Sequence, residues 1–136
     1  MGDLSKNFSR SEFACQCGCG ADNISMYIVK SLQRIRDIVG APMTITSGIR
    51  CAKHNKAIGG VGRSSHVPSD LSDGEGVVGH AVDIKCEDSV LRYKILKAST
   101  RYFMRIGIGE NFIHLDNDTS KPQTVAWDYY GSDHKG

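Results

Sequence analysis

The most regular pattern of apolar and polar positions lies in residues 24–39. Apolar residues recur there at steps of three and four, while lysine, arginine and aspartate occupy the other positions. The apolar positions are Ile24, Ile28, Leu32, Ile35 and Val39. This spacing places them on one face of a helix. Because Gly40 follows directly and glycine commonly ends helices, the pattern predicts an amphipathic helix over 24–39.

Shorter patterns predict the remaining elements. A second helix is expected over 89–102, and a single helical turn near Ser9, which Glu12 follows at capping-box spacing. Alternating or β-branched segments predict strands, and these are 43–47, 81–84, 105–109, 111–116 and 124–130. Together they predict an α+β fold, with helices packed on one side of a small antiparallel sheet.

Residues 50–80 show almost no periodicity and are rich in glycine. A loop of this length in a compact domain is usually functional or disordered. The 136 residues contain no repeat or linker and fit one domain of ordinary size. We therefore expect a single domain over 1–136, in which 1–23 form an irregular N-terminal segment.

Composition and charge exclude several classes of protein. The 17 basic and 15 acidic residues give a net charge of +2, without the basic excess of a nucleic-acid binder. No apolar run approaches the ~18 residues of a membrane span, and residues 1–10 lack the apolar core of a secretory signal. We therefore expect no nucleic-acid partner, no membrane insertion, and a monomer without an export signal of its own.

The five cysteines leave at least one unpaired within the chain. Cys15, Cys17 and Cys19 alternate with other residues, which differs from the C-x-x-C spacing of zinc knuckles and redox motifs. Reduced thiols in a cytoplasmic chain are the default expectation. A disulfide from this group to Cys51 or Cys86, and a structural metal bound by the group, are the alternatives.

Two histidines and an aspartate are candidates for metal chemistry. His66 lies in the glycine-rich stretch, Asp83 lies within an apolar strand, and His114 shares a strand face with Phe112 and Asp116. A carboxylate between apolar neighbours is costly to bury unless it is paired or binds a metal. Two imidazoles and one carboxylate suit Zn²⁺ and leave a fourth position open. Surface histidines with a salt-bridged aspartate are the alternative interpretation.

Six short motifs follow one another in order along the chain, and they are Ser47-Gly48-Ile49-Arg50, His54-Asn55, Gly59-Gly60, Ser64-Ser65-His66, Gly79-His80-Ala81-Val82-Asp83 and the late His114. Taken together, they resemble the zinc D-Ala-D-Ala carboxypeptidase family, which includes phage L-alanyl-D-glutamate endopeptidases. The segment Asn7 to Cys19 is also similar to the usual N-terminal segment of that family. The resemblance covers about residues 7–130 and implies a single domain of the hedgehog and DD-peptidase type.

The resemblance also implies the roles of particular residues. His66, Asp83 and His114 would bind zinc as the cofactor. Arg50 would bind a substrate carboxylate or carbonyl and stabilise the oxyanion, because its guanidinium suits such a group. Ser64 would be a polar group beside the substrate.

Two features depart from the family pattern. About ten residues are inserted between His66 and Asp83, near 67–78. His80 lies closer to Asp83, but at the opposite strand parity, so His66 is retained as the ligand. The position that usually holds the glutamate base is Asn111, which leaves Glu110 and Asp116 as candidates for the general base.

The resulting hypothesis is a zinc-dependent peptidoglycan peptidase of the phage endolysin type. It would be either a DD-carboxypeptidase or an L-alanyl-D-glutamate endopeptidase, in which a zinc-activated water attacks a stem-peptide bond. It would reside in the host bacterial cytoplasm before lysis and act on the periplasmic or extracellular wall. The alternative is a non-catalytic zinc domain that binds the cell wall or a partner protein.

Overall fold

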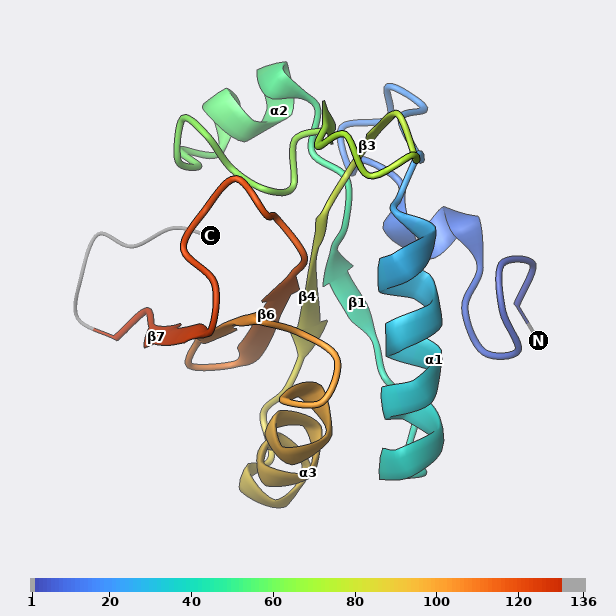
Figure 1. Cartoon of the computed structure of the whole chain (residues 1–136), viewed down its shortest axis with the longest axis vertical. Coiled ribbons are helices and arrows are strands. Elements are labelled where there is room, and N and C mark those ends of the chain that lie inside the picture. Colours follow the sequence, from blue (N-terminus) through green and yellow to red (C-terminus); the bar gives the residue numbers. More distant parts are fainter. Residues whose placement is uncertain (1, 131–136) are drawn as a thin grey trace.

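A five-stranded sheet forms the centre of the computed structural model, which describes residues 2–130 (Figure 1). Its strand order is β1-β4-β6-β5-β7. These strands are β1 (Ile45–Ser47), β4 (Ala81–Lys85), β6 (Phe112–Asp116), β5 (Arg105–Ile108) and β7 (Val125–Asp128). The helical elements are η1 (Arg10–Phe13), α1 (Met26–Val39), α2 (Ala52–Ala57) and α3 (Ser89–Ser99). A separate hairpin joins β2 (Ser69–Asp70) to β3 (Val77–Val78).

The two faces of the sheet have different chemistry, because side chains alternate along each strand. Val82 and Ile84 of β4, with Ile113 and Leu115 of β6, belong to the buried hydrophobic core. The helices α1 and α3 contribute to the same core and contact each other. The opposite face carries the polar side chains of β4 and β6. The predicted α+β class, with helices on one side of a small sheet, is confirmed.

One pairing in the sheet differs from the antiparallel arrangement expected. The pairs β1–β4, β4–β6 and β5–β6 are antiparallel, whereas β7 pairs with β5 in parallel. After β6 the chain crosses to the outer edge of β5 through residues 117–124, instead of returning by a hairpin. Alternation within 124–130 correctly indicates a strand, but it carries no information about the partner or the direction of pairing.

The stretch 50–80 contains more regular structure than its sequence suggests. It includes α2 and the β2–β3 hairpin, elements too short to produce a visible period. The hairpin spans 69–78, most of the segment near 67–78 that the sequence analysis interpreted as an insertion. Within it, Glu75 Oε1 accepts a hydrogen bond from Met26 N at 2.6 Å, and Val77 O accepts one from Asn23 Nδ2 at 2.6 Å. The insertion therefore packs against the start of α1.

The N-terminal segment is an integral part of the fold. The expected turn near Ser9 is η1, and Glu12 Oε2 accepts a hydrogen bond from Ser9 N at 2.7 Å. Phe8 and Phe13 are buried in the core, and Ile49 N donates to Phe13 O at 2.8 Å. This contact holds the segment beside the loop that follows β1. Within residues 2–130, no helix has the length and apolar character needed to cross a membrane.

Candidate active site

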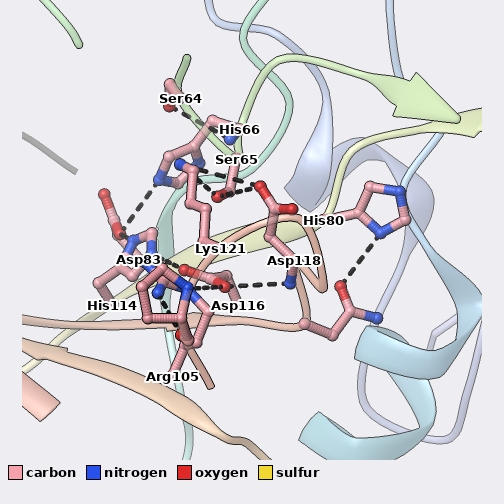
Figure 2. A network of polar contacts seen from close by, with 12 residues as sticks. Ser64, Ser65, His66, His80, Asp83, Arg105, His114, Asp116, Asp118 and Lys121 are labelled. Atoms are coloured by element: carbon pink, nitrogen blue, oxygen red, sulfur yellow. Dashed lines mark hydrogen bonds and ion pairs between the residues drawn. The ribbon is translucent and has the colours of Figure 1, made fainter. Parts of the chain in front are cut away.

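Three side chains from separate segments converge on the polar face of the sheet (Figure 2). Asp83 comes from β4 and His114 from β6, and these two residues are direct partners in the strand register. His66 comes from the loop before the β2–β3 hairpin. Potential ligand atoms of all three lie within 4.8 Å of one another. The structure thus brings together the three residues that the resemblance implied as zinc ligands.

The orientation of His66 is set by a main-chain carbonyl. Its Nδ1 lies 2.7 Å from Gly48 O, which can only accept, so Nδ1 carries the proton. Nε2 is then left with a free lone pair and faces Asp83 Oδ1 at 3.3 Å. This buried nitrogen has no hydrogen-bond partner among the described residues. A buried, unprotonated nitrogen aimed at a carboxylate is the arrangement that a cation between them would satisfy.

His114 is oriented by a carboxylate on its far side. Its Nε2 donates to Asp116 Oδ2 at 2.7 Å, which leaves Nδ1 facing Asp83 Oδ1 at 2.9 Å. Asp116 is completely buried, and its Oδ1 accepts from Arg105 Nε at 2.8 Å and from Asp118 N at 3.1 Å. Carboxylates that hold metal-binding histidines in this way fix the ring orientation and the tautomer.

The electrostatics of the cluster also favour a bound cation. Burial acts to raise the pKa of Asp83, but His66 and His114 outweigh it and hold that pKa well below its usual range. Burial acts to lower the pKa of His114, yet hydrogen bonds to Asp116 and Asp83 raise it to about 9. Burial lowers the pKa of His66. In the metal-free cluster an ionised Asp83 is thus paired with a protonated His114, and a bound cation would take the place of that positive charge. The donor set of two imidazoles and a carboxylate fits Zn²⁺.

His80 lies outside this cluster, as its strand parity predicted. Figure 2 shows its ring directed away from His66 and His114. Its Nδ1 contacts Asn117 Oδ1 and its Nε2 contacts Ser69 O, both at 3.1 Å. Both ring nitrogens are therefore engaged elsewhere, on the side of the insertion.

Arg50 is held beside the cluster by a small scaffold. Its Nη1 donates to Asn55 Oδ1 at 2.9 Å, and its Nη2 lies 3.9 Å from Asp83 Oδ2. A Cβ on Gly60 would collide with Asn55 Oδ1 and would lie 2.9 Å from Arg50 Nη1. The second glycine of the Gly59-Gly60 motif is thus required by close approach to Arg50 and Asn55.

A cavity of about 610 Å³ opens beside Arg50 and Asp83. Its wall is formed by Gln16, Thr46, Ser47, Arg50, His54, Ile58, Asp83, Lys85, Glu87, Asn111 and Phe112. This volume is in the range typical of small-ligand sites. The cavity brings a fixed guanidinium and a candidate metal ligand to one surface, where a peptide could contact both.

Comparison with known protein families identifies this arrangement. The sequence model of the Peptidase M15 family matches residues 6–116, a range that includes His66, Asp83 and His114. The chain belongs to the peptidase M15 family. Because M15 peptidases depend on zinc, the protein is a zinc metallopeptidase, and the His–Asp–His cluster supplies residues suited to its metal. No curated protein sequence matched the chain.

The other predicted site residues of this M15 peptidase are Ser64, Asp116 and Glu110, and none of them is part of the cavity wall. Ser64 is buried, and its Oγ accepts a hydrogen bond from His66 N at 3.2 Å, so it supports the loop that carries His66. Asp116 contacts the edge of His114 opposite Asp83. Glu110 is exposed at the β5–β6 turn, and among the described residues the cavity wall includes Glu87 but not Glu110.

Sequence analysis did not identify three residues that surround His114. Arg105 pairs with Asp116, and its guanidinium lies 4.7 Å from the centre of the Trp127 ring. Trp127 and Tyr129 come from the end of the chain, with ring centres 5.6 Å and 6.5 Å from that of His114. Gly107 makes room for them, because a Cβ there would lie 2.7 Å from Tyr129. Of these contacts, only the Arg105–Asp116 ion pair could have been inferred from the sequence, because the two residues carry opposite charges on consecutive predicted strands.

Proposed function

We propose that this M15 peptidase hydrolyses stem peptides of bacterial peptidoglycan, as a small phage-type endolysin. The bond cut would be either the D-Ala-D-Ala bond or the L-alanyl-D-glutamate bond. The observation that carries the proposal is the placement of Arg50 beside Asp83 in one cavity wall. Stem peptides carry free carboxylates close to both of these bonds, and a guanidinium binds a carboxylate through paired hydrogen bonds.

The protein's own residues would prepare the site in three ways. His66, Asp83 and His114 would hold Zn²⁺. When bound, this ion would lower the pKa of a water ligand and polarise the scissile carbonyl. Gly48 O and Asp116 keep the two imidazoles in the tautomers that expose Nε2 and Nδ1. We therefore assign Asp116 a positioning role, since both of its oxygens are already engaged by His114, Arg105 and Asp118.

Arg50 would have one of two roles, and its hydrogen bond to Asn55 holds it in place for either. The Arg50 side chain is only 8% exposed, and an ionic contact is stronger in such a setting than in bulk water. The guanidinium would fix the substrate carboxylate or stabilise the oxyanion that forms at the attacked carbonyl. Asn55 prevents the side chain from swinging away from Asp83.

The proton acceptor has two candidates for direct comparison. Glu110 stays a prediction from the sequence, although its carboxylate is exposed at a turn outside the cavity wall. His54 lies in that wall together with Arg50. Histidine is the side chain most often used for proton transfer in enzymes. Conservative substitution of each residue distinguishes them.

We further propose synthesis in the cytoplasm of a bacterial host, followed by action on the wall outside the membrane, as a monomer. None of the five cysteines, all of which lie within residues 2–130, forms a disulfide, which suits synthesis in a reducing compartment. The cavity opens directly to the surface beside exposed Lys85 and Glu87, so a stem peptide that remains attached to glycan could approach it.

The test is a digest of purified peptidoglycan, and of a synthetic stem peptide that contains both candidate bonds, with products identified by mass spectrometry. Release of D-alanine identifies a carboxypeptidase, and release of the peptide that begins with D-glutamate identifies the endopeptidase. Chelation should stop the cleavage and added Zn²⁺ should restore it. If the zinc-loaded protein cleaves neither substrate, the peptidoglycan assignment is refuted and the non-catalytic alternative gains support.

Arg50→Lys is the matched control variant for substrate recognition. It keeps the positive charge and removes the two-pronged hydrogen bonding. We expect kcat/KM to fall by roughly tenfold or more, the scale of losing one charge-assisted hydrogen bond, with zinc content unchanged. Activity equal to that of the wild type would exclude Arg50 as the carboxylate anchor.

A further inference from the structure

Four cysteines form a second cluster, apart from the His–Asp–His site. Cys15, Cys17 and Cys19 come from the loop after η1, and Cys51 directly follows Arg50. Their four Sγ atoms lie within 4.8 Å of one another. Cys17 Sγ is 3.4 Å from Cys15 Sγ and 3.6 Å from Cys51 Sγ.

These separations match those of sulfurs around a single tetrahedral metal. A Zn–S distance of about 2.3 Å implies an S···S edge of about 3.8 Å. A disulfide would require about 2.05 Å and would join only two of the sulfurs. Four thiols gathered within 4.8 Å of one another leave a position between them that one ion could fill.

The backbone explains how three alternating cysteines can face one point. Gly18 and Gly20 have φ values of +83° and +88°, which turn the chain in a way that side-chain-bearing residues rarely adopt. Gly18 N donates to Cys15 O at 3.3 Å, and Cys15 N donates to Ala21 O at 2.8 Å. Together these features close a small loop over residues 15–21 and curl the thiols toward its inner side.

Main-chain N–H groups point at two of the sulfurs. Cys51 N lies 3.4 Å from Cys15 Sγ, and His54 N lies 3.3 Å from Cys51 Sγ. Such donors stabilise negative charge on sulfur and are typical of the surroundings of metal-bound thiolates. Burial acts to raise the pKa of Cys15, but the hydrogen bond from Cys51 N and the contacts with Cys17 and with the Cys51 thiol lower it to about 7. The neighbouring thiols of Cys15 and Cys19 instead raise the pKa of Cys17 to about 12.

We propose that Cys15, Cys17, Cys19 and Cys51 bind a structural Zn²⁺, distinct from the catalytic metal. Four sulfur ligands in a tetrahedron are typical of closed, structural zinc sites. Because Cys17 and Cys19 are exposed, the ion has access to the site.

The position of Cys51 gives this ion a consequence for the active site. The ion would link the N-terminal loop to Cys51, which lies 36 positions after Cys15. Cys51 directly follows Arg50 and lies three residues before His54. A cross-link of that span restricts the unfolded chain and holds the Arg50 segment in place. The proposal does not depend on the identity of the substrate.

Metal stoichiometry and cobalt substitution test it. Protein purified under reducing, anaerobic conditions should hold about two zinc ions per chain, and His114→Ala should hold about one. With Co²⁺ in place of zinc, both proteins should show thiolate-to-cobalt charge-transfer bands and the intense ligand-field bands of a tetrahedral site. Cys19→Ser should lose these bands. The matched control Cys86→Ala, which removes the one cysteine outside the cluster, should keep them.

The wild-type cobalt spectrum does not depend on whether any variant folds. The proposal is overturned if wild-type protein shows no thiolate–cobalt bands. It is equally overturned if His114→Ala loses all metal, or if the anaerobic protein has the mass of a disulfide-bonded chain. Cleavage activity is not part of this test, so failure here leaves the proposed peptidase function untouched.

Discussion

Replacement of Asp116 by asparagine removes one negative charge and almost no volume from beneath the metal site. The carboxylate now accepts from His114 Nε2 through one oxygen, and from Arg105 Nε and Asp118 N through the other. An amide offers one oxygen and one NH₂ group, so either His114 or the pair Arg105 and Asp118 must face the NH₂ group instead of an oxygen. The oxygen is expected to face the two donors, Arg105 and Asp118, and the NH₂ group is then expected to face His114.

That orientation would change the tautomer of the metal ligand. His114 Nε2 would have to accept, which moves the ring proton to Nδ1, the nitrogen that faces Asp83. A protonated Nδ1 cannot bind metal. The loss of a carboxylate in this position typically weakens metal binding by ~10–100-fold, or ~1.4–2.7 kcal/mol.

A separate cost falls on the stability of the metal-free fold. The Arg105 side chain is 11% exposed and Asp116 is fully buried, so their 2.8 Å contact is shielded from water. Asparagine keeps the hydrogen bond from Arg105 but removes its charge assistance, a difference of ~1 kcal/mol, which corresponds to a Tm lower by roughly 3–5 °C in a domain of this size.

The assay is competition for zinc against a chromophoric chelator, with His114→Ala defining the signal of this site. Thermal unfolding of the metal-free protein accompanies it. Asp128→Asn, an exposed change of the same charge on β7, is the control and should alter neither measurement. If Asp116→Asn binds zinc as tightly as the wild type, the tautomer argument is refuted. If it binds zinc normally yet is inactive, Asp116 is the general base after all.

Two further predictions concern the cavity. Gly60→Ala should lower kcat/KM by about ten- to a hundredfold, because its Cβ displaces Asn55 and with it Arg50; zinc content should not change, and unaltered kinetics would contradict the scaffold role. Steady-state kinetics of His54→Gln and Glu110→Gln then locate the proton acceptor. If His54 is the acceptor, its variant should lose ~10²-fold in kcat while Glu110→Gln stays near the wild type. The reverse result would assign the role to Glu110, and two fully active variants would place the acceptor elsewhere.

Local patterns in the sequence were sufficient for the elements that form the core. The three- and four-residue spacing from Ile24 to Val39 predicts a helix because burial of one helix face leaves that period in the sequence. The observed helix α1 begins two residues later, at Met26, and Ile24 instead forms a β-bridge with Gly79. Alternation around His114 predicts β6 and its polar face for the same kind of reason. The ordered motifs around Arg50 and His66 indicated the family, because the residue types that can bind zinc or anchor a carboxylate are few.

What depended on contacts between distant segments was decided only by the tertiary structure. Strand alternation carries no partner information, so the parallel β5–β7 pairing was not predictable, and the partners of Asp116 became evident only in the three-dimensional arrangement. The cysteine cluster is a similar case, because a 36-residue separation shows nothing of how the N-terminal loop packs against the residue after Arg50. The spacing of apolar residues in the sequence reflects whether each side chain faces solvent or the core. Strand register, histidine tautomer and ligand geometry depend instead on which distant segments the fold brings together.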